Sequence, residues 1–141
     1  MSQDNSTDKV EIRKGYYRSG ALMREVPYVN GQIHGIEKWY RESGALYREA
    51  PYENGERQGI LKDYYESGAL WWEAPFAKGR LHGIRKEYYE SGALRVETSY
   101  KKGEKHGIEK RYYETGALQC RCLYENGENK GVIKRLNKIT E

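Results

Sequence analysis

The tetrapeptide Ser-Gly-Ala-Leu occurs at residues 19–22, 43–46, 67–70 and 91–94, and it returns as Thr-Gly-Ala-Leu at residues 115–118. A spacing of 24 residues separates its glycines, which are Gly20, Gly44, Gly68, Gly92 and Gly116. A fixed period of this length is typical of repeat proteins, in which each unit is one supersecondary element that stacks on its neighbours. The repeat therefore constrains the fold more than any other feature of the chain.

Each unit contains two short runs of residues that favour strands, and two turn signals separate these runs. Ser-Gly marks one turn, whereas the other is marked by Asn30-Gly31, Asn54-Gly55 and Asn126-Gly127, with Lys-Gly in the third and fourth units. Asn-Gly favours the two-residue type I′ hairpin, because both central residues need positive φ. The sequence therefore predicts an all-β fold, an elongated single-layer antiparallel β-meander of 24-residue β-hairpin repeats with about ten short strands in an open ribbon.

The repeats also define the domain organisation. Residues 1–9 are polar and predict a disordered N-terminal tail. Residues 10–136 hold five repeats and a closing strand over residues 132–136, and residues 137–141 form a C-terminal tail. Leu136 stands where the earlier units have Tyr, and terminal repeats are expected to differ because they end the sheet.

Composition excludes several classes of protein. The apolar fraction is 37%, a third of the residues are charged, and 14 Tyr accompany one Phe, which predicts a thin structure without a large core. The net charge of +4 is spread over all units and is too diffuse to argue for nucleic acid, so we expect no nucleic-acid partner. The N-terminus has no apolar segment of a signal peptide and no stretch could span a membrane, so we expect a cytoplasmic protein, unless a native leader was removed.

The Ser-Gly turn predicts the register of each hairpin. A symmetric turn places Lys38 opposite Glu49, and the same rule pairs Lys14 with Glu25, Lys62 with Glu73, and Lys86 with Glu97. We expect these to be cross-strand ion pairs that support the register. The rule also places Ile36 opposite Pro51 and Tyr40 opposite Tyr47.

The last unit breaks this pattern, because Lys110 faces Arg121. We expect this end to be the loosest part of the sheet, or to be a place where an acidic group of a partner docks.

The two faces of the ribbon differ in how constant they are. One face repeats an Ile/Pro column, a Lys/Glu column and a Tyr-rich column that includes Trp71, and we interpret it as scaffold. The opposite face has a central column that changes from unit to unit, and such positions are free to suit a partner. Its partner-binding candidates are Trp39, Arg48, Asp63, Trp72, Glu87 and Arg111. The alternative is that these side chains only cover a thin sheet.

No constellation in the sequence predicts catalysis or a metal site. His34, His82 and His106 share one repeat position, and units about 10 Å apart cannot bring them onto one ion, so we expect a structural role at the turn. Cys120 and Cys122 point to the same face of a strand and cannot easily bridge; their role stays open. The repeated Glu residues have Lys partners, and the glycines lack a phosphate-loop context. We therefore expect no enzyme, no metal and no cofactor.

The full repeat has a known pattern. Asn-Gly-x-x-His-Gly-Ile-x-Lys-x-Tyr-Tyr-Glu-Ser-Gly-Ala-Leu-x-x-Glu, with clear copies at residues 30–49 and 78–97, resembles the MORN-repeat variant (membrane occupation and recognition nexus). The resemblance covers residues 11–135. Bacterial chains made only of such repeats resemble the YwqK-type family of toxin–antitoxin antitoxins, which implies a protein that binds and neutralises a partner protein. For MORN repeats in general the resemblance implies scaffolding, dimer formation and phospholipid binding.

Three functional hypotheses follow. The first is a non-enzymatic protein-interaction module on the variable face, including an antitoxin-like inhibitor whose partner is a toxin or effector. The second is a scaffold that binds phospholipid headgroups at a membrane surface through Lys and Tyr. The third is an aromatic-rich carbohydrate-binding repeat module. We also expect a homo-oligomer, because the sheet ends and one apolar column stay exposed.

Overall fold

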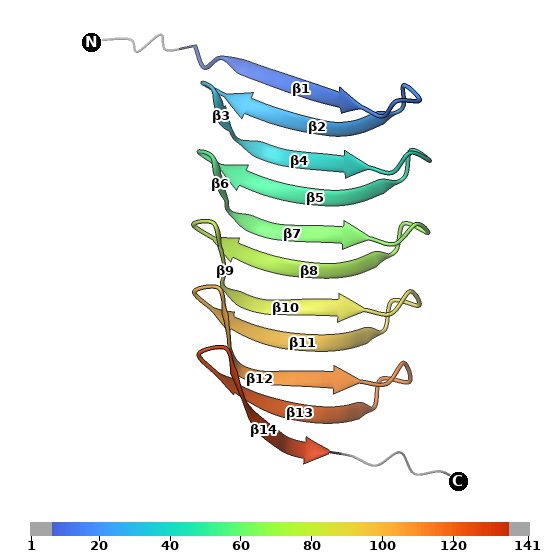
Figure 1. Cartoon of the computed structure of the whole chain (residues 1–141), viewed down its shortest axis with the longest axis vertical. Helices are drawn as coiled ribbons and strands as arrows, with labels where there is room; N and C mark the ends of the chain where they lie inside the picture. Colours follow the sequence, from blue (N-terminus) through green and yellow to red (C-terminus); the bar gives the residue numbers. More distant parts are fainter. Residues whose placement is uncertain (1–6, 136–141) are drawn as a thin grey trace, which may run out of the picture.

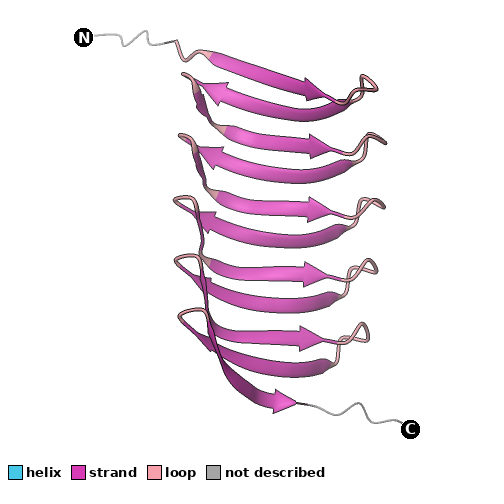
Figure 2. Ribbon diagram, viewed as in Figure 1, coloured by secondary structure: helices cyan, strands magenta, loops and turns pink. Residues whose placement is uncertain are grey.

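The structure, a computed structural model, describes residues 7–135. The hairpins stack one after another along the long axis in a single layer, and no helix occurs in these residues (Figures 1 and 2). Leu136 and the tail at residues 137–141 lie outside the described residues, as do residues 1–6 of the N-terminal tail. Within that tail, Asp8 accepts a hydrogen bond from the Asn30 side chain at 3.0 Å, and Asn30 also pairs with the backbone of Lys9.

One sheet contains every strand that the structure describes. Its main path runs in the order β1-β2-β4-β5-β7-β8-β10-β11-β12-β13-β14, and the short strands β3, β6 and β9 pair with β2, β5 and β8. The strands are β1 (Val10–Tyr16), β2 (Leu22–Val29), β3 (Gln32–Ile33), β4 (Gly35–Tyr40), β5 (Leu46–Glu53), β6 (Glu56–Arg57), β7 (Gly59–Tyr64), β8 (Leu70–Ala77), β9 (Arg80–Leu81), β10 (Gly83–Tyr88), β11 (Leu94–Lys101), β12 (Glu104–Tyr112), β13 (Leu118–Glu125) and β14 (Glu128–Arg135). The predicted all-β ribbon of antiparallel hairpins is confirmed. The two-residue strands β3, β6 and β9 were not predicted.

Both turn predictions are confirmed by backbone conformation. Asn30 and Gly31 have φ of 51° and 81°, and the other four turns of this kind also have positive φ at both central residues. At the Ser-Gly turn, Gly44 has φ of 92°, its N–H donates to the Arg41 carbonyl, and Arg41 N–H donates to the Ala45 carbonyl. A Cβ on Gly44 would meet nothing within 4 Å, so the backbone conformation alone requires glycine here.

The hairpin register is confirmed up to the last pair before the turn. Lys38 pairs with Glu49 and Ile36 with Pro51, and the other predicted Lys–Glu positions also oppose one another. Lys110 opposes Arg121, as expected. The predicted pairing of Tyr40 with Tyr47 is wrong, because a β-bulge after Trp39 places Tyr40 opposite Leu46. The prediction assumed that paired residues lie equally far from the turn in both strands, and a bulge adds one residue to one strand.

The expected cross-strand ion pairs mostly do not form. Among the four opposed Lys–Glu positions, which all lie in the described residues, Lys14 and Glu25 form an ion pair at 3.9 Å, and no other reaches 4.0 Å. The Glu residues instead accept hydrogen bonds from tyrosine of the next hairpin: Tyr64 to Glu49 at 2.5 Å, and Tyr88 to Glu73 at 2.9 Å. Apart from Lys14 and Glu25, the opposed charges therefore alternate without direct contact.

Side chains beside the Ser-Gly turns connect each hairpin to the next. Tyr17 Oη donates to the Tyr40 carbonyl at 2.6 Å, and Tyr65 and Tyr89 make the same bond to the carbonyls 23 residues further on. Arg41 takes this position in the second unit and donates to the Tyr64 carbonyl at 3.0 Å. Tyr and Arg can replace one another at this position because the side chain of each donates a hydrogen bond to the equivalent carbonyl of the next hairpin.

Proline decides whether the strand at the other edge is continuous. Where Pro27, Pro51 and Pro75 stand, a two-residue strand and a six-residue strand follow, separated by one residue. Ser99 replaces proline in the fourth unit, and β12 then runs unbroken, with Thr98 paired to Glu109. Proline has no N–H, so it cannot complete a ladder at this point.

Most of the buried apolar side chains lie on the variable face. Ala50 and Ala74 are 0% exposed and Leu61 is 2% exposed, whereas Ile36 on the repeat face is 49% exposed. The buried column places a long residue opposite a small one, as with Leu61 opposite Ala74 and Glu37 opposite Ala50. The small residue leaves room for long side chains to fold over it. The face that looks like scaffold in the sequence is thus the more open face of the sheet.

Candidate interaction surface

The register brings the candidate residues into one row across the middle of the variable face. Trp39 opposes Arg48, Arg48 opposes Asp63, and Asp63 opposes Trp72. The row continues through Glu87, Val96 and Arg111 on the following strands. The contiguity that sequence spacing predicted is therefore present in the fold. Neighbouring strands in such a row lie about 4.8 Å apart.

Arg48 and Asp63 form the centre of this row. Arg48 Nε and Nη2 donate to the two carboxylate oxygens of Asp63 at 2.6 and 2.7 Å. The hydrogen bonds that Arg48 donates to Asp63 raise the pKa of its guanidinium. Asp63 is only 2% exposed, so it cannot itself contact a partner. It holds Arg48, whose side chain is 28% exposed, in one orientation.

The two tryptophans flank this pair, and each has an arginine over its ring. The Arg24 guanidinium lies 4.7 Å from the Trp39 ring centre, and that of Arg85 lies 4.9 Å from the Trp72 ring centre. Arg24 is fixed by Glu37 at 2.5 Å, and Arg85 is fixed by Glu87 at 2.8 Å. Both Trp rings are half-buried. The variable face therefore presents aromatic and guanidinium groups whose orientations are already fixed.

A second ionic cluster lies at the C-terminal end of the same face. Lys105 and Arg111 both bond the carboxylate of Glu109, at 2.9 and 2.8 Å. Burial would raise the pKa of Glu109, but the hydrogen bonds from Lys105 and Arg111 outweigh it, and the pKa lies below its ordinary value. Arg111 stays 53% exposed and remains open to contact.

Four residues of this surface were missed or misplaced by sequence reasoning. Glu37 and Glu109 are 4% and 2% exposed and anchor the arginines. Their signal was the small residue opposite each, Ala50 for Glu37 and Cys122 for Glu109. Trp71 was assigned to the Tyr column of the repeat face, and this is wrong. The bulge turns it against Tyr65, with ring centres 5.8 Å apart, and it turns the equivalent Tyr47 toward Arg48.

The histidine position has a structural role at the turn edge. His34 Nδ1 accepts the Asn54 backbone N–H at 3.2 Å, and Gln58, at the same repeat position, accepts that of Lys78 at 2.9 Å. These bonds join one turn to the next. The prediction of a structural role is confirmed for His34.

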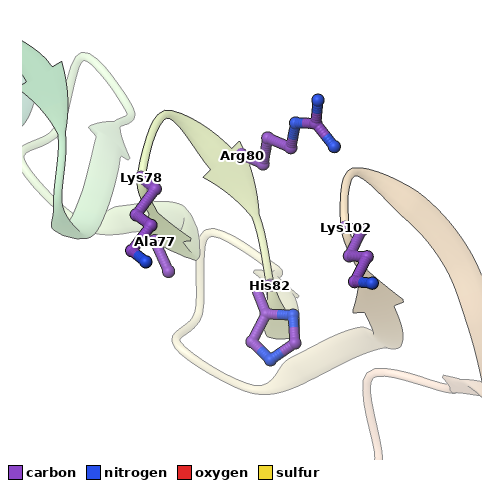
Figure 3. A pocket seen from close by; sticks show the side chains of 5 residues that line it. All are labelled: Ala77, Lys78, Arg80, His82 and Lys102. Atoms are coloured by element: carbon purple, nitrogen blue, oxygen red, sulfur yellow. The ribbon is translucent and has the colours of Figure 1, made fainter.

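A hollow of about 410 Å³ opens beside the turns of the third and fourth units. Its lining includes Lys78, Arg80, His82 and Lys102 (Figure 3). Figure 3 shows Arg80 pointing away from Lys78, so the cations do not converge on one point. Lys78, Arg80 and Lys102 are exposed side chains. The hollow therefore lacks the geometry of a built anion site.

The cysteines lie at the end of the variable face. Cys120 opposes Arg111 and Cys122 opposes Glu109, and both thiols are free. Burial raises the pKa of the Cys122 thiol, so the neutral form is favoured. In residues 7–135 no group of three or more His, Cys, Asp or Glu side chains is placed to hold a metal ion.

Comparison with known families identifies the repeat. The model of the MORN repeat variant family matches residues 12–30, 33–54, 81–102 and 105–126, which together make up more than half of the chain. The chain belongs to the MORN repeat variant family. MORN repeats are non-catalytic modules that generally mediate interactions with proteins or membranes. No curated protein matches this MORN repeat protein.

The third unit has the same structure as its neighbours, although the family model does not match it. Residues 55–80 fall between the matched ranges, yet β7 and β8 form the same hairpin with the same register and the same bulge, here after Asp63. This unit contains Asp63 and Trp72, which are central to the row of candidates. Residues 7–135 contain no helix that is long and apolar enough to cross a bilayer.

Proposed function

We propose that this MORN repeat protein is a non-enzymatic protein-interaction module whose partner binds the variable face. The proposal depends on one observation above all. Two half-buried Trp rings, each under an arginine, flank the Arg48–Asp63 pair in a single row. Trp and Arg are the residues that most often dominate the binding energy of protein interfaces.

Fixed geometry supports the same proposal. Arg24, Arg48 and Arg85 each have a carboxylate partner on the sheet, within 2.5 to 2.8 Å. A side chain that is already ordered loses less conformational entropy when a partner binds. The carboxylates also satisfy part of each guanidinium, so a partner need not supply a buried counter-charge. The surface thus favours a partner with aromatic and hydrogen-bond-accepting groups.

The repeat face does not favour an anionic membrane surface as the partner. The register places Lys38 between Glu25 and Glu49, and it places Lys62 between Glu49 and Glu73. An anionic headgroup at either lysine would approach two carboxylates as well. Membrane attraction by basic residues needs an excess of positive charge at the surface, and an alternating column has none in its central part.

The finer hypothesis is that the partner is a toxin or effector that this protein neutralises. It follows from the family resemblance of the sequence and from a surface suited to protein contact. Co-expression with the product of a neighbouring gene provides the test. Wild-type protein should relieve growth arrest caused by that product, and a chain with Trp39→Ala and Trp72→Ala should not. Arrest that persists with both chains would refute the antitoxin role.

The binding surface itself is tested by affinity. A partner captured from the native host would be purified and titrated against wild type and against the Trp39→Ala, Trp72→Ala chain. Loss of two anchor residues should weaken binding by about a hundredfold or more. Thermal melting of the free protein should show that the double variant still folds.

A matched variant on the other face provides the control. A chain with Ile36→Ala and Ile84→Ala also removes two large side chains, each about half exposed at 49% and 51%. It should keep the affinity of wild type for the partner. Equal loss of affinity in both double variants would show that binding does not depend on the variable face.

A further inference from the structure

The repeat face has an exposed apolar stripe along its length. Ile12, Ile36, Ile60 and Ile84 are 61%, 49%, 51% and 51% exposed. Each of the first three opposes a proline of the same hairpin. Between successive isoleucines the stripe is hollowed. Ile36, Pro51 and Ile60 line a hollow of about 80 Å³, and Ile60, Pro75 and Ile84 line one of about 320 Å³.

A column of alternating charge runs directly beside this stripe. Hairpin register and the register between hairpins join the positions into one series: Lys14, Glu25, Lys38, Glu49, Lys62, Glu73, Lys86, Glu97 and Lys110. Each strand adds one charge, and its sign changes at every step. The next two positions, Arg121 and Lys134, are again basic and end the alternation.

We propose that a second copy of this chain docks on the repeat face, antiparallel, about a two-fold axis that lies along the strand direction between β5 and β7. Such an axis makes each column face its own copy in reverse strand order. Glu49 then lies opposite Lys62 of the second copy, and Lys38 lies opposite its Glu73. Glu25 lies opposite its Lys86, and Lys14 opposite its Glu97. Every charge from β1 to β11 meets its opposite.

The apolar stripe is complementary in the same arrangement. Ile60 of one copy lies opposite Pro51 of the other, and Ile36 lies opposite Pro75. The hollow above Pro75 is bounded by Ile60 and Ile84, so an isoleucine of the second copy enters between two isoleucines of the first. Ser99 is also small and lies opposite Ile12 of the second copy.

The alternation and its break at the C-terminal end select this register over those nearer the C-terminus, and a register nearer the N-terminus would join fewer strands. A shift of the axis onto a strand would bring like charges together throughout the column. A shift by a full strand spacing toward the C-terminus restores opposite pairs but places Lys14 against Arg121. Arg121 already has its Nε buried without a hydrogen-bond partner, so a further cation there is unfavourable. The break therefore limits the contact to β1 through β11.

The contact has the size of a stable interface. Eight strands at about 4.8 Å each, over about five residues at about 3.3 Å, give roughly 600 Å² of sheet per copy. The two copies together reach roughly 1,200 Å², the lower end of specific interfaces. The variable faces of both copies point outward, so this association leaves the proposed partner-binding surface free.

A charge-swap experiment tests the proposal. Sedimentation equilibrium of the full chain at low salt should show a dimer for wild type. Lys62→Glu sets Glu49 against a carboxylate at two symmetric places, and it should raise the dissociation constant about thirtyfold. Adding Glu49→Lys to Lys62→Glu restores opposite charges across the interface. Within each sheet the double variant has as many pairs of like-charged neighbours as Lys62→Glu alone, so the two variants differ only across the interface. The double variant should therefore recover the dimer.

Ile60→Asp is the second test variant, because Ile60 is 51% exposed and is not needed for the core. It should give a folded monomer by circular dichroism and sedimentation. A wild-type chain that is monomeric at about 100 μM would overturn the proposal. The proposal would also be overturned if Lys62→Glu left the dissociation constant of the dimer unchanged. The same holds if adding Glu49→Lys did not restore the dimer. None of these outcomes affects partner binding on the opposite face, so the two proposals fail independently.

Discussion

The first three hairpins and the C-terminal end of the sheet share one repeat pattern but differ at two positions of it. Pro27, Pro51 and Pro75 interrupt the strand that follows each of them, whereas Ser99 and Leu123 are followed by the continuous strands β12 and β14. The acidic position of the charge column holds Glu in the first four hairpins and Arg121 in the fifth. The proline position thus controls the pairing of the next strand, and the Glu position controls the charge of the surface.

The difference shows which parts of the repeat are structural. Hairpin register survives both changes, because Lys110 still opposes Arg121 and Ile108 opposes Leu123. The turns and the bulge therefore set the register, not the Lys–Glu contacts. Charge alternation is free to serve the surface, and it stops at Arg121, one hairpin after Ser99 ends the pattern of interrupted strands.

The largest expected effect comes from the buried ion pairs. Arg48→Ala removes both hydrogen bonds that the structure gives to the carboxylate of Asp63, which is 2% exposed, and should lower the free energy of unfolding by about 3 kcal/mol. Arg111→Ala leaves Glu109 with Lys105 and should lower it by about 1 kcal/mol. Urea denaturation measures both. Equal losses would show that the two clusters do not differ as their contacts indicate.

A turn glycine gives the next largest effect. Gly44→Val forces a β-branched residue to φ of 92° and should lower the free energy of unfolding by about 2 kcal/mol. Gly116→Val creates the same strain at φ of 91° but near the end of the stack. In a repeat protein the terminal change should mainly fray the last hairpin. Amide exchange by NMR would distinguish global from local opening. Identical exchange maps for the two variants would contradict the claim that the terminal change frays only the last hairpin.

Arg121→Glu should reverse the charge difference between the two regions. It restores the alternating column beside Lys110 and should raise the free energy of unfolding by about 0.5 kcal/mol. Arg121→Gln removes the repulsion without adding attraction and serves as the control, with a smaller gain. Thermal melting at low and high salt provides the measurement. A gain for Arg121→Glu that does not shrink at high salt would contradict an electrostatic cause.

Ser99→Pro should transfer the N-terminal backbone pattern to the fourth unit. Three other hairpins accept proline at this position, so the free energy of unfolding should change by less than about 0.5 kcal/mol. The pairing of Thr98 with Glu109 should be lost, and protection of the nearby amides from exchange should fall. Unchanged protection would mean that proline does not cause the interruption.

The smallest expected effect is a pH dependence in alkali. Burial, and after it the hydrogen bond to Glu73, raises the pKa of Tyr88 to about 12. The folded state therefore holds this proton more tightly than the unfolded state. The contribution to stability is complete below pH 10 and is lost as pH rises from 10 to 12. Tyr88→Phe should flatten the fall of the melting temperature in that window, and an unchanged slope would be inconsistent with the raised pKa.

The sequence predicted the architecture well because the information was periodic. Ser-Gly and Asn-Gly fixed two turns, and a count from the first turn gave the register of Lys38 with Glu49. The bulge after Trp39 was not predictable from that count, because its extra residue lies between two positions that both look like strand. The short strands before Gly35, Gly59 and Gly83 were also missed.

The candidate surface was only partly predictable. Spacing placed Trp39, Arg48, Asp63 and Trp72 in one row, but it could not show that Asp63 is enclosed. Enclosure depends on long side chains folding over small ones such as Ala50 and Ala74. Ile36 and Ile60 belong to the constant column that we interpreted as scaffold, and they stay 49% and 51% exposed. Periodicity assigns a residue to a face, but packing decides which face is buried.

Side-chain footprinting by hydroxyl radicals, read by mass spectrometry, tests most directly whether binding lies where the units differ. Wild-type protein would be labelled with and without its captured partner. If the partner binds the variable face, it should lower the labelling of Trp39 and Trp72, while Ile36 and Ile84 keep the labelling that they have without it. Protection of Ile36 and Ile84 by the partner, with Trp39 and Trp72 unchanged, would contradict binding on the variable face.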